Sequence, residues 1–177
     1  KLRSYSYLYP SEDDDPKTFY SDPVASAAVA ATYTKLGFTA VKFDPAGPYT
    51  IFDGHQPSLE DLDRSENFCK YIREAIGNKA DILFGTHGQF TASGASRIAK
   101  KIEKYDPLWF EEPVPPDNTE EMAKVARSTT IPIATGERLT TKQEFSQVLK
   151  LNAANILQPA LGRVGGIWEA KKNCYFS

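Results

Sequence analysis

The sequence predicts an α/β fold, and specifically a partial (β/α)8 barrel of the TIM type with about six of the eight β/α units. Short β-rich runs alternate with amphipathic helical stretches along the 177 residues. The ends of successive strands are evenly spaced, since the steps between positions 87, 111, 137 and 158 are 24, 26 and 21 residues. No glycine-rich phosphate turn is present, although doubly wound sheets usually carry one. We therefore expect residues 1–177 to form one incomplete barrel domain.

The first unit begins with alternating side chains over residues 3–9, a pattern typical of a strand. An alanine-rich stretch over residues 23–36 predicts a helix, with Asp22 as its N-cap and Gly37 at its end. Residues 38–43 then predict the second strand.

The longest irregular stretch covers residues 45–58 and is rich in proline and glycine. Loops of this length inside a compact domain are usually functional or mobile. The stretch carries His55, which we include among the candidate substrate contacts.

The later units follow the same order. Ser58 caps a helix predicted over residues 58–76, Gly77 ends it, and residues 80–84 predict a strand. Further strands are expected at 108–110, 131–135 and 154–157, and further helices at 93–105, 118–128, 141–149 and 165–172.

The composition is that of an ordinary globular protein, with 41% hydrophobic and 25% charged residues. The 23 acidic and 21 basic residues give a formal charge of -2 without a long run of one sign, which argues against nucleic acid or an anionic membrane as a partner. No apolar stretch approaches the ~18 residues of a membrane span, and no secretory signal pattern is visible. We expect a cytoplasmic protein.

Nearly every predicted strand ends on a side chain that can bind a cation, move a proton or orient a polar substrate. These side chains are Lys42, Asp44, Thr86, His87, Gln89, Glu111, Glu112, Glu137, Arg138 and Gln158. The carboxyl ends of barrel strands meet at one mouth, where several carboxylates would repel each other unless a cation lay between them. Because these strand-end side chains include no cysteine and only one histidine, the pattern favours Mg²⁺ over Zn²⁺.

Three runs carry a family resemblance: YDPLWFEEPVPPDN, IPIATGERLTTKQEF and ILQPALGRVGGIWEAKK. Together they resemble the mandelate racemase and muconate lactonizing branch of the enolase superfamily, and within it the acid-sugar dehydratases of the galactonate dehydratase type. A lone E-E-P would be a weak signal. Its combination with G-E-R one β/α unit later is specific.

The resemblance implies a longer enzyme, with a capping domain before an eight-stranded barrel of which this chain matches the first six strands. It implies a Mg²⁺-dependent dehydratase that removes the proton α to the carboxylate of a sugar acid and passes through an enediolate before water is lost from the β-carbon. The missing strands would leave two open sheet edges, so we expect a homo-oligomer.

The resemblance also assigns roles to individual residues. Glu111 and Glu137 match metal ligands, and His87 matches a general acid. Lys42 matches the first lysine of a K-x-K pair, which can serve as a base or hold a carboxylate, and a nearby cation would lower its pKa. Glu112 is expected to turn away toward a neighbouring strand or a basic side chain.

Two departures change the expected site. Gly85 stands where the family has an aspartate ligand, and Asp44 stands at the second lysine of K-x-K. We hypothesise that Asp44 reaches across the gap left by Gly85 and supplies the third metal carboxylate. Ala160 replaces an aspartate that orients a histidine of strand seven, so Lys42 or a residue outside the chain is left as the base.

Three more polar side chains are candidate substrate contacts, namely Gln89, Arg138 and Gln158, although Arg138 could instead pair with a carboxylate. Two other functions stay open. One is a racemase, epimerase or lactonizing enzyme of the same superfamily. The other is a non-catalytic truncated barrel that binds a metal or a partner.

Overall fold

The computed structural model describes residues 3–12, 14–47 and 53–174. Its centre is a six-stranded parallel sheet in which the strands follow one another in sequence order. The strands are β1 (Ser6–Tyr7), β2 (Ala40–Phe43), β3 (Asp81–Gly85), β4 (Trp109–Glu111), β5 (Ile133–Thr135) and β6 (Ile156–Leu157). The sheet is not closed, which confirms the predicted partial barrel of the TIM type.

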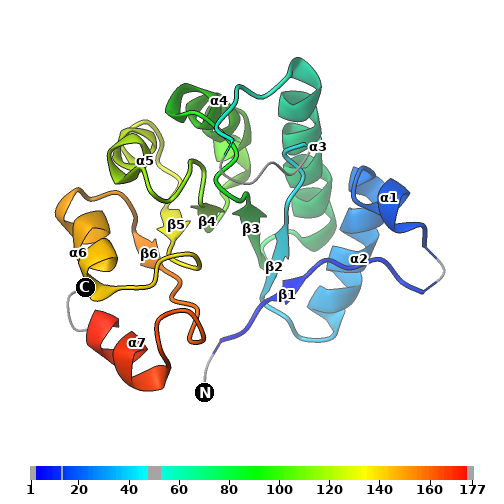
Figure 1. Cartoon of the computed structure of the whole chain (residues 1–177). Helices are drawn as coiled ribbons and strands as arrows, with labels where there is room; N and C mark the ends of the chain where they lie inside the picture. The colour runs from blue at the N-terminus through cyan, green and yellow to red at the C-terminus, as the bar shows by residue number, and fades with distance from the viewer. Residues whose placement is uncertain (1–2, 13, 48–52, 175–177) are drawn as a thin grey trace.

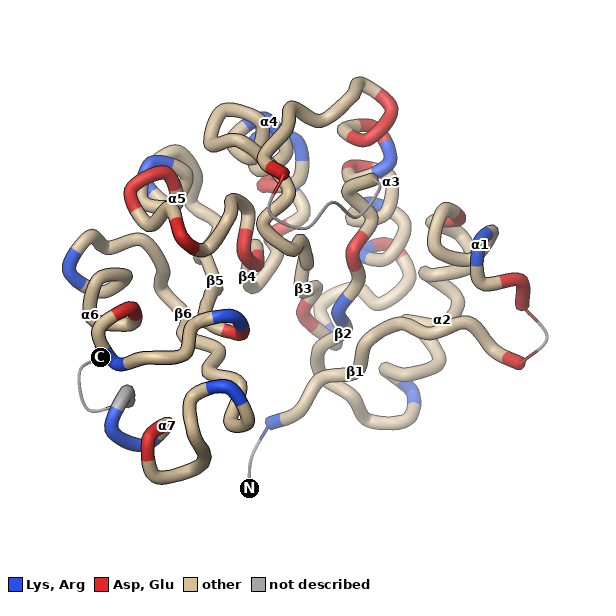
Figure 2. Tube along the Cα trace, in the orientation of Figure 1, with Lys and Arg blue, Asp and Glu red and all other residues tan. Residues whose placement is uncertain are grey.

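A helix follows each strand and lies on the outer side of the arc that the strands form (Figure 1). The α-helices are α1 (Pro16–Phe19), α2 (Pro23–Lys35), α3 (Leu59–Ile76), α4 (Ala92–Ile102), α5 (Thr119–Ala126), α6 (Lys142–Lys150) and α7 (Ile167–Cys174), and η1 (Glu103–Tyr105) is a 3-10 turn. Acidic and basic residues are interspersed along these helices (Figure 2). Within the described residues, no helix is long and apolar enough to cross a membrane.

The sheet separates two apolar clusters because side chains alternate across each strand. The larger cluster joins outward residues of the strands, such as Phe84 and Phe110, to the helices. The smaller one lies on the inner face and consists of Ala40, Leu83, Trp109 and Ala134, with Leu108 and Ile156 packed against it. It forms an apolar floor beneath the inward side chains at the carboxyl ends of the strands.

Most predicted elements lie within a few residues of their observed positions, with two corrections. The first strand is shorter than expected, since only Ser6–Tyr7 of residues 3–9 pairs with β2. The helix α1 was missed, although Asp15 caps it and Pro16 opens it, because four residues are too few to show a helical period.

Candidate active site at the carboxyl ends of the strands

The register of the sheet brings the inward side chains of three neighbouring strands together. Lys42 lies opposite Leu83, and Gly85 lies opposite Glu111. Asp44 follows Lys42 by two residues, so both point to the inner face, as the sequence predicted. The polar side chains therefore lie just above the apolar floor.

Lys42 and Glu111 form a buried ion pair. The Nζ of Lys42 is 2.6 Å from Oε1 of Glu111, and the two side chains are only 11% and 3% exposed. The other carboxylate oxygen, Oε2, accepts hydrogen bonds of 3.2 Å from Trp109 Nε1 and from Gln158 Nε2. Both oxygens of Glu111 are thus engaged by donors from three different strands or strand ends.

The environment keeps Lys42 protonated. Burial by itself lowers the pKa of Lys42, but the charges of Glu111 and Asp44 and the hydrogen bond to Glu111 outweigh it, so the pKa is raised. The sequence had suggested a lowered pKa through a nearby cation. The carboxylates around Lys42 act in the opposite direction, and the effect of a cation on this pKa stays a prediction.

Asp44 occupies the space that a side chain at position 85 would fill. A Cβ built on Gly85 would lie 1.6 Å from Oδ1 and 2.7 Å from Cγ of Asp44, far inside any allowed contact. That Oδ1 is buried and has no hydrogen-bond partner among the described residues. A glycine at position 85 is therefore what gives the Asp44 carboxylate its place beside Glu111.

The second oxygen of Asp44 faces His87. The Oδ2 of Asp44 is 3.2 Å from Nδ1 of His87, with the side chains 18% and 23% exposed. The ring hydroxyl of Tyr7, on β1, lies against the same carboxylate, and burial together with the charge of Asp44 raises the pKa of Tyr7. Burial also raises the pKa of Asp44, against the opposing effect of Lys42 and His87.

We predict that Gly85→Ala destabilises the protein by about 1–3 kcal/mol, because the new methyl group forces Asp44 out of its place. The same substitution in an Asp44→Ala background is expected to cost much less, since the space is then empty. Urea unfolding of the wild type, the two single variants and the double variant measures this coupling. Equal costs in both backgrounds would show that Asp44 does not occupy the space.

Glu112 turns away from the mouth, as predicted. It has a left-handed backbone with φ of 42°, and its Oε2 lies 3.3 Å from Nε of Arg138. Arg138 also donates a 2.7 Å hydrogen bond to the backbone oxygen of His87. The hydroxyl of Thr86 donates to the backbone oxygens of Glu111 and Glu112. These contacts fix the loop that carries His87.

The protonation of Glu112 predicts a pH dependence. Burial raises the pKa of Glu112 to about 8, with Arg138 only partly opposing it. In the unfolded chain a glutamate ionises near pH ~4.3, so between these values the folded state holds the extra proton and stability falls as the pH rises. Glu112→Gln should lose this component, and its unfolding free energy should change less between about pH 5 and about pH 8. Glu121→Gln on α5 is the control, and identical profiles for both variants would contradict the prediction.

The predicted metal ligands Asp44, Glu111 and Glu137 do not lie close enough together to form a metal site with three protein ligands among the described residues. Glu137 is 39% exposed at its side chain and lies 3.7 Å from Nε of Arg138. Among the described residues, no three His, Cys, Asp or Glu side chains gather closely enough to hold a metal ion. The donor chemistry nevertheless fits Mg²⁺, which proteins often bind through one or two carboxylates plus water and substrate. The unpartnered Oδ1 of Asp44 beside Glu111 meets that requirement.

The other predicted substrate contacts lie around this cluster. Gln89 is buried, and its Nε2 is 3.5 Å from the backbone oxygen of Ala46. His55 pairs with Phe90 in a short parallel bridge, and its ring lies 5.1 Å from that of Phe90. Residues 48–52 of the same predicted loop lie outside the described residues. A substrate contact for Gln89 or His55 stays a prediction.

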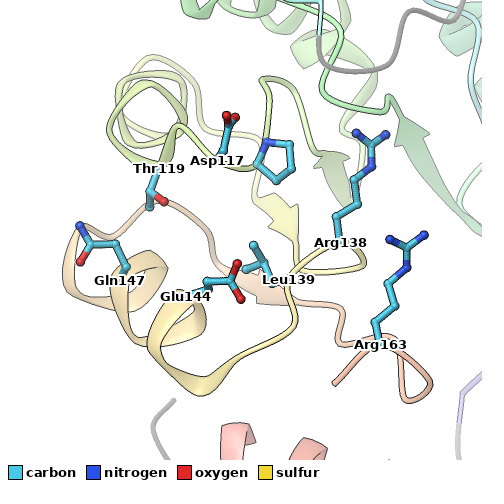
Figure 3. Close-up of a pocket in the computed structure, with 8 residues that line it drawn as sticks. Asp117, Thr119, Arg138, Leu139, Glu144, Gln147 and Arg163 are labelled. Carbon is cyan, nitrogen blue, oxygen red and sulfur yellow. The ribbon is translucent and has the colours of Figure 1, made fainter. Parts of the chain in front are cut away.

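A hollow of about 450 Å³ borders the cluster on the side of α5 and α6. Figure 3 shows Arg138 and Arg163 on one side of it and Thr119 and Gln147 on the other. Lys42 and the residues around it do not line this hollow. Arg138 is the link between the two, because it also contacts His87.

Two residues of this cluster, Tyr7 and Trp109, were not among those predicted from the sequence. Tyr7 was seen only as part of a strand, and Trp109 was assigned to the core. Trp109 does belong to the inner apolar floor, but its indole N–H also holds Glu111. The alternation of inward residues along β4 places Trp109 on the face of Glu111 and could have indicated this contact.

The chain is similar to one protein family and to several named enzymes. The family described as Enolase C-terminal domain-like matches residues 25–175. D-xylonate dehydratase of Haloferax volcanii is 33% identical over 175 residues, which cover 97% of this chain and 41% of that protein. D-gluconate dehydratase of Thermoproteus tenax is 35% identical over 151 residues, covering 85% of this chain and 30% of the relative.

A solved structure shares the fold closely. It is that of a mandelate racemase/muconate lactonizing enzyme from Sulfitobacter sp., with 58% identity and a TM-score of 0.96 over 98% of this chain and 44% of the other. The chain thus spans less than half the length of the proteins it matches. By the extent of the family match and by its dehydratase relatives, this chain belongs to the enolase C-terminal domain-like family of the enolase superfamily.

Proposed function

We propose that this chain is the barrel part of a Mg²⁺-dependent dehydratase that acts on a small sugar acid. The observation that carries the proposal is the convergence of Lys42, Asp44, His87 and Glu111 on the inner face of the sheet, at the carboxyl ends of its strands. The family membership and the relatives named D-xylonate and D-gluconate dehydratase support it. Chemistry in this class of barrel takes place at that end of the strands.

The cation ligands in this proposal are Glu111 and Asp44, joined by Glu137 from the end of β5. When bound, Mg²⁺ would hold the substrate carboxylate and stabilise the negative charge that develops as the α-proton leaves. Trp109 and Gln158 keep Glu111 oriented through its other oxygen. The inner apolar floor lies directly below the cluster.

The proton chemistry falls to the residues beside these ligands. His87 would protonate the departing β-hydroxyl through Nε2, the ring nitrogen away from Asp44, and Asp44 orients the ring. Lys42 carries a positive charge that suits the substrate carboxylate. The base that removes the α-proton would be Lys42, after it has left Glu111 and lost its own proton, or a residue outside this chain. Gln89, Arg138, Gln158 and His55 are proposed to contact the hydroxyl groups of the substrate.

The test is a screen of the full-length protein against a library of sugar acids with Mg²⁺, in which formation of a 2-keto-3-deoxy acid is scored. We expect the protein to dehydrate at least one sugar acid, and we expect this activity to be lost when Mg²⁺ is removed by a chelator. An epimerised acid without water loss would support the racemase alternative. Metal binding without turnover of any acid would support a non-catalytic barrel.

A further inference from the structure

The side-chain space above Gly85 is shared by two neighbours of opposite charge. A Cβ built on Gly85 would lie 1.6 Å from Oδ1 of Asp44 and 3.1 Å from Cε of Lys42. The end of the Lys42 side chain and the Asp44 carboxylate therefore surround one point, directly beside the strand residue Glu111. This point is where an inward side chain from β3 would otherwise stand.

The ammonium of Lys42 holds the position next to Glu111. It lies 2.6 Å from Oε1, and within the described residues it is the ion-pair partner of Glu111, whose Oε2 receives only the neutral donors Trp109 and Gln158. With the Lys42 side chain 11% and that of Glu111 3% exposed, water does little to screen the pair.

The single positive charge of Lys42 does not balance the two carboxylates of Asp44 and Glu111. Asp44 and Glu111 repel each other, and Lys42 attracts both. The buried Oδ1 of Asp44 has no hydrogen-bond partner among the described residues. A divalent cation matches two carboxylates in charge, but it cannot share Oε1 of Glu111 with an ammonium, because the two positive groups would stand within a few ångströms of each other in a poorly screened site.

We propose that Lys42 is an internal counter-ion that competes with a divalent cation for Oε1 of Glu111, so that its ammonium must leave Glu111 before the cation binds there. Lys42 thereby sets the affinity of the protein for the cation. This inference rests on the cation site of the proposed function. It assigns to Lys42 a role in metal loading that is separate from any role in the reaction.

The experiment is calorimetric titration of the purified protein with Mn²⁺, followed by Mg²⁺. Lys42→Met keeps the apolar stem without the charge and should bind Mn²⁺ about tenfold more tightly or better than the wild type. Lys42→Arg keeps the charge, and its fork pairs well with a carboxylate, so it should bind Mn²⁺ more weakly than the wild type. Glu111→Gln should remove the binding, which shows that the titration reports this site.

The outcomes separate the two proposals. Wild-type binding that Glu111→Gln abolishes but Lys42→Met leaves equal or weaker overturns the counter-ion role alone. Should Lys42→Met fold only when Mn²⁺ is present, that dependence supports the proposal. If Lys42→Met does not fold at all, the titration of Lys42→Arg with Mn²⁺ is the test. An affinity of Lys42→Arg for Mn²⁺ equal to or above that of the wild type would overturn the inference. Absence of binding in the wild type overturns the cation site and this inference together.

Discussion

Replacing Glu111 with leucine is expected to lower the free energy of unfolding by about 3–5 kcal/mol. The substitution leaves the buried ammonium of Lys42 without its partner at 2.6 Å, and a buried unpaired charge costs far more than the pair contributes when intact. Asp44 also neutralises Lys42 in part, so we expect a value toward the lower end. Urea unfolding measures the effect.

A double variant separates the charge effect from packing. In Lys42→Met/Glu111→Leu both charges are gone, and most of the lost stability should return. The matched control is Glu121→Leu on α5, whose partner Lys124 is 61% exposed at its side chain, and surface pairs of this kind contribute about 1 kcal/mol or less. Equal losses for Glu111→Leu and Glu121→Leu would contradict a buried, interdependent pair.

His87→Gln is expected to reduce the turnover of the sugar acid found by the screen by about 10²–10⁴-fold. The amide cannot supply a proton to the departing hydroxyl, although it keeps much of the size and polarity of the ring. Mn²⁺ binding should be retained, because His87 is not among the proposed ligands. The rate of product formation under saturating substrate measures the loss.

Exchange of the α-proton with deuterated water assigns the role of His87. If His87 acts as the acid alone, the variant should still exchange the α-proton while losing dehydration. Loss of both exchange and dehydration would make His87 the base instead. Turnover of His87→Gln close to that of the wild type would show that His87 takes no part in proton transfer.

The fold followed from the sequence because local signals and the β/α period agreed. Asp22, Ser58 and Thr141 cap α2, α3 and α6 in the structure, close to where the predicted helices begin. The first strand was overestimated because alternation predicts which residues are extended but not which find a pairing partner. β1 pairs only with β2, and just Ser6–Tyr7 do so.

The sequence predicted which candidate side chains share one face of the sheet, but it did not predict the contacts between them. The i+2 relation placed Lys42 and Asp44 on one face, and the gap at Gly85 suggested where Asp44 goes. The 1.6 Å separation between Oδ1 of Asp44 and the place of a Cβ at position 85 supports that location. Distances between strands depend on register and rotamers, which sequence patterns do not specify. The ion pair of Lys42 with Glu111 and the orientation of Glu137 toward Arg138 therefore emerged only from the structure.

Anomalous diffraction from crystals soaked in Mn²⁺ would locate the cation relative to Asp44, Glu111 and Lys42. We expect one peak above Gly85, in contact with the carboxylates of Asp44 and Glu111, and an Nζ of Lys42 that has moved away from Glu111. A peak held by Glu111 and Glu137 but not by Asp44, with Lys42 still 2.6 Å from Glu111, would overturn it.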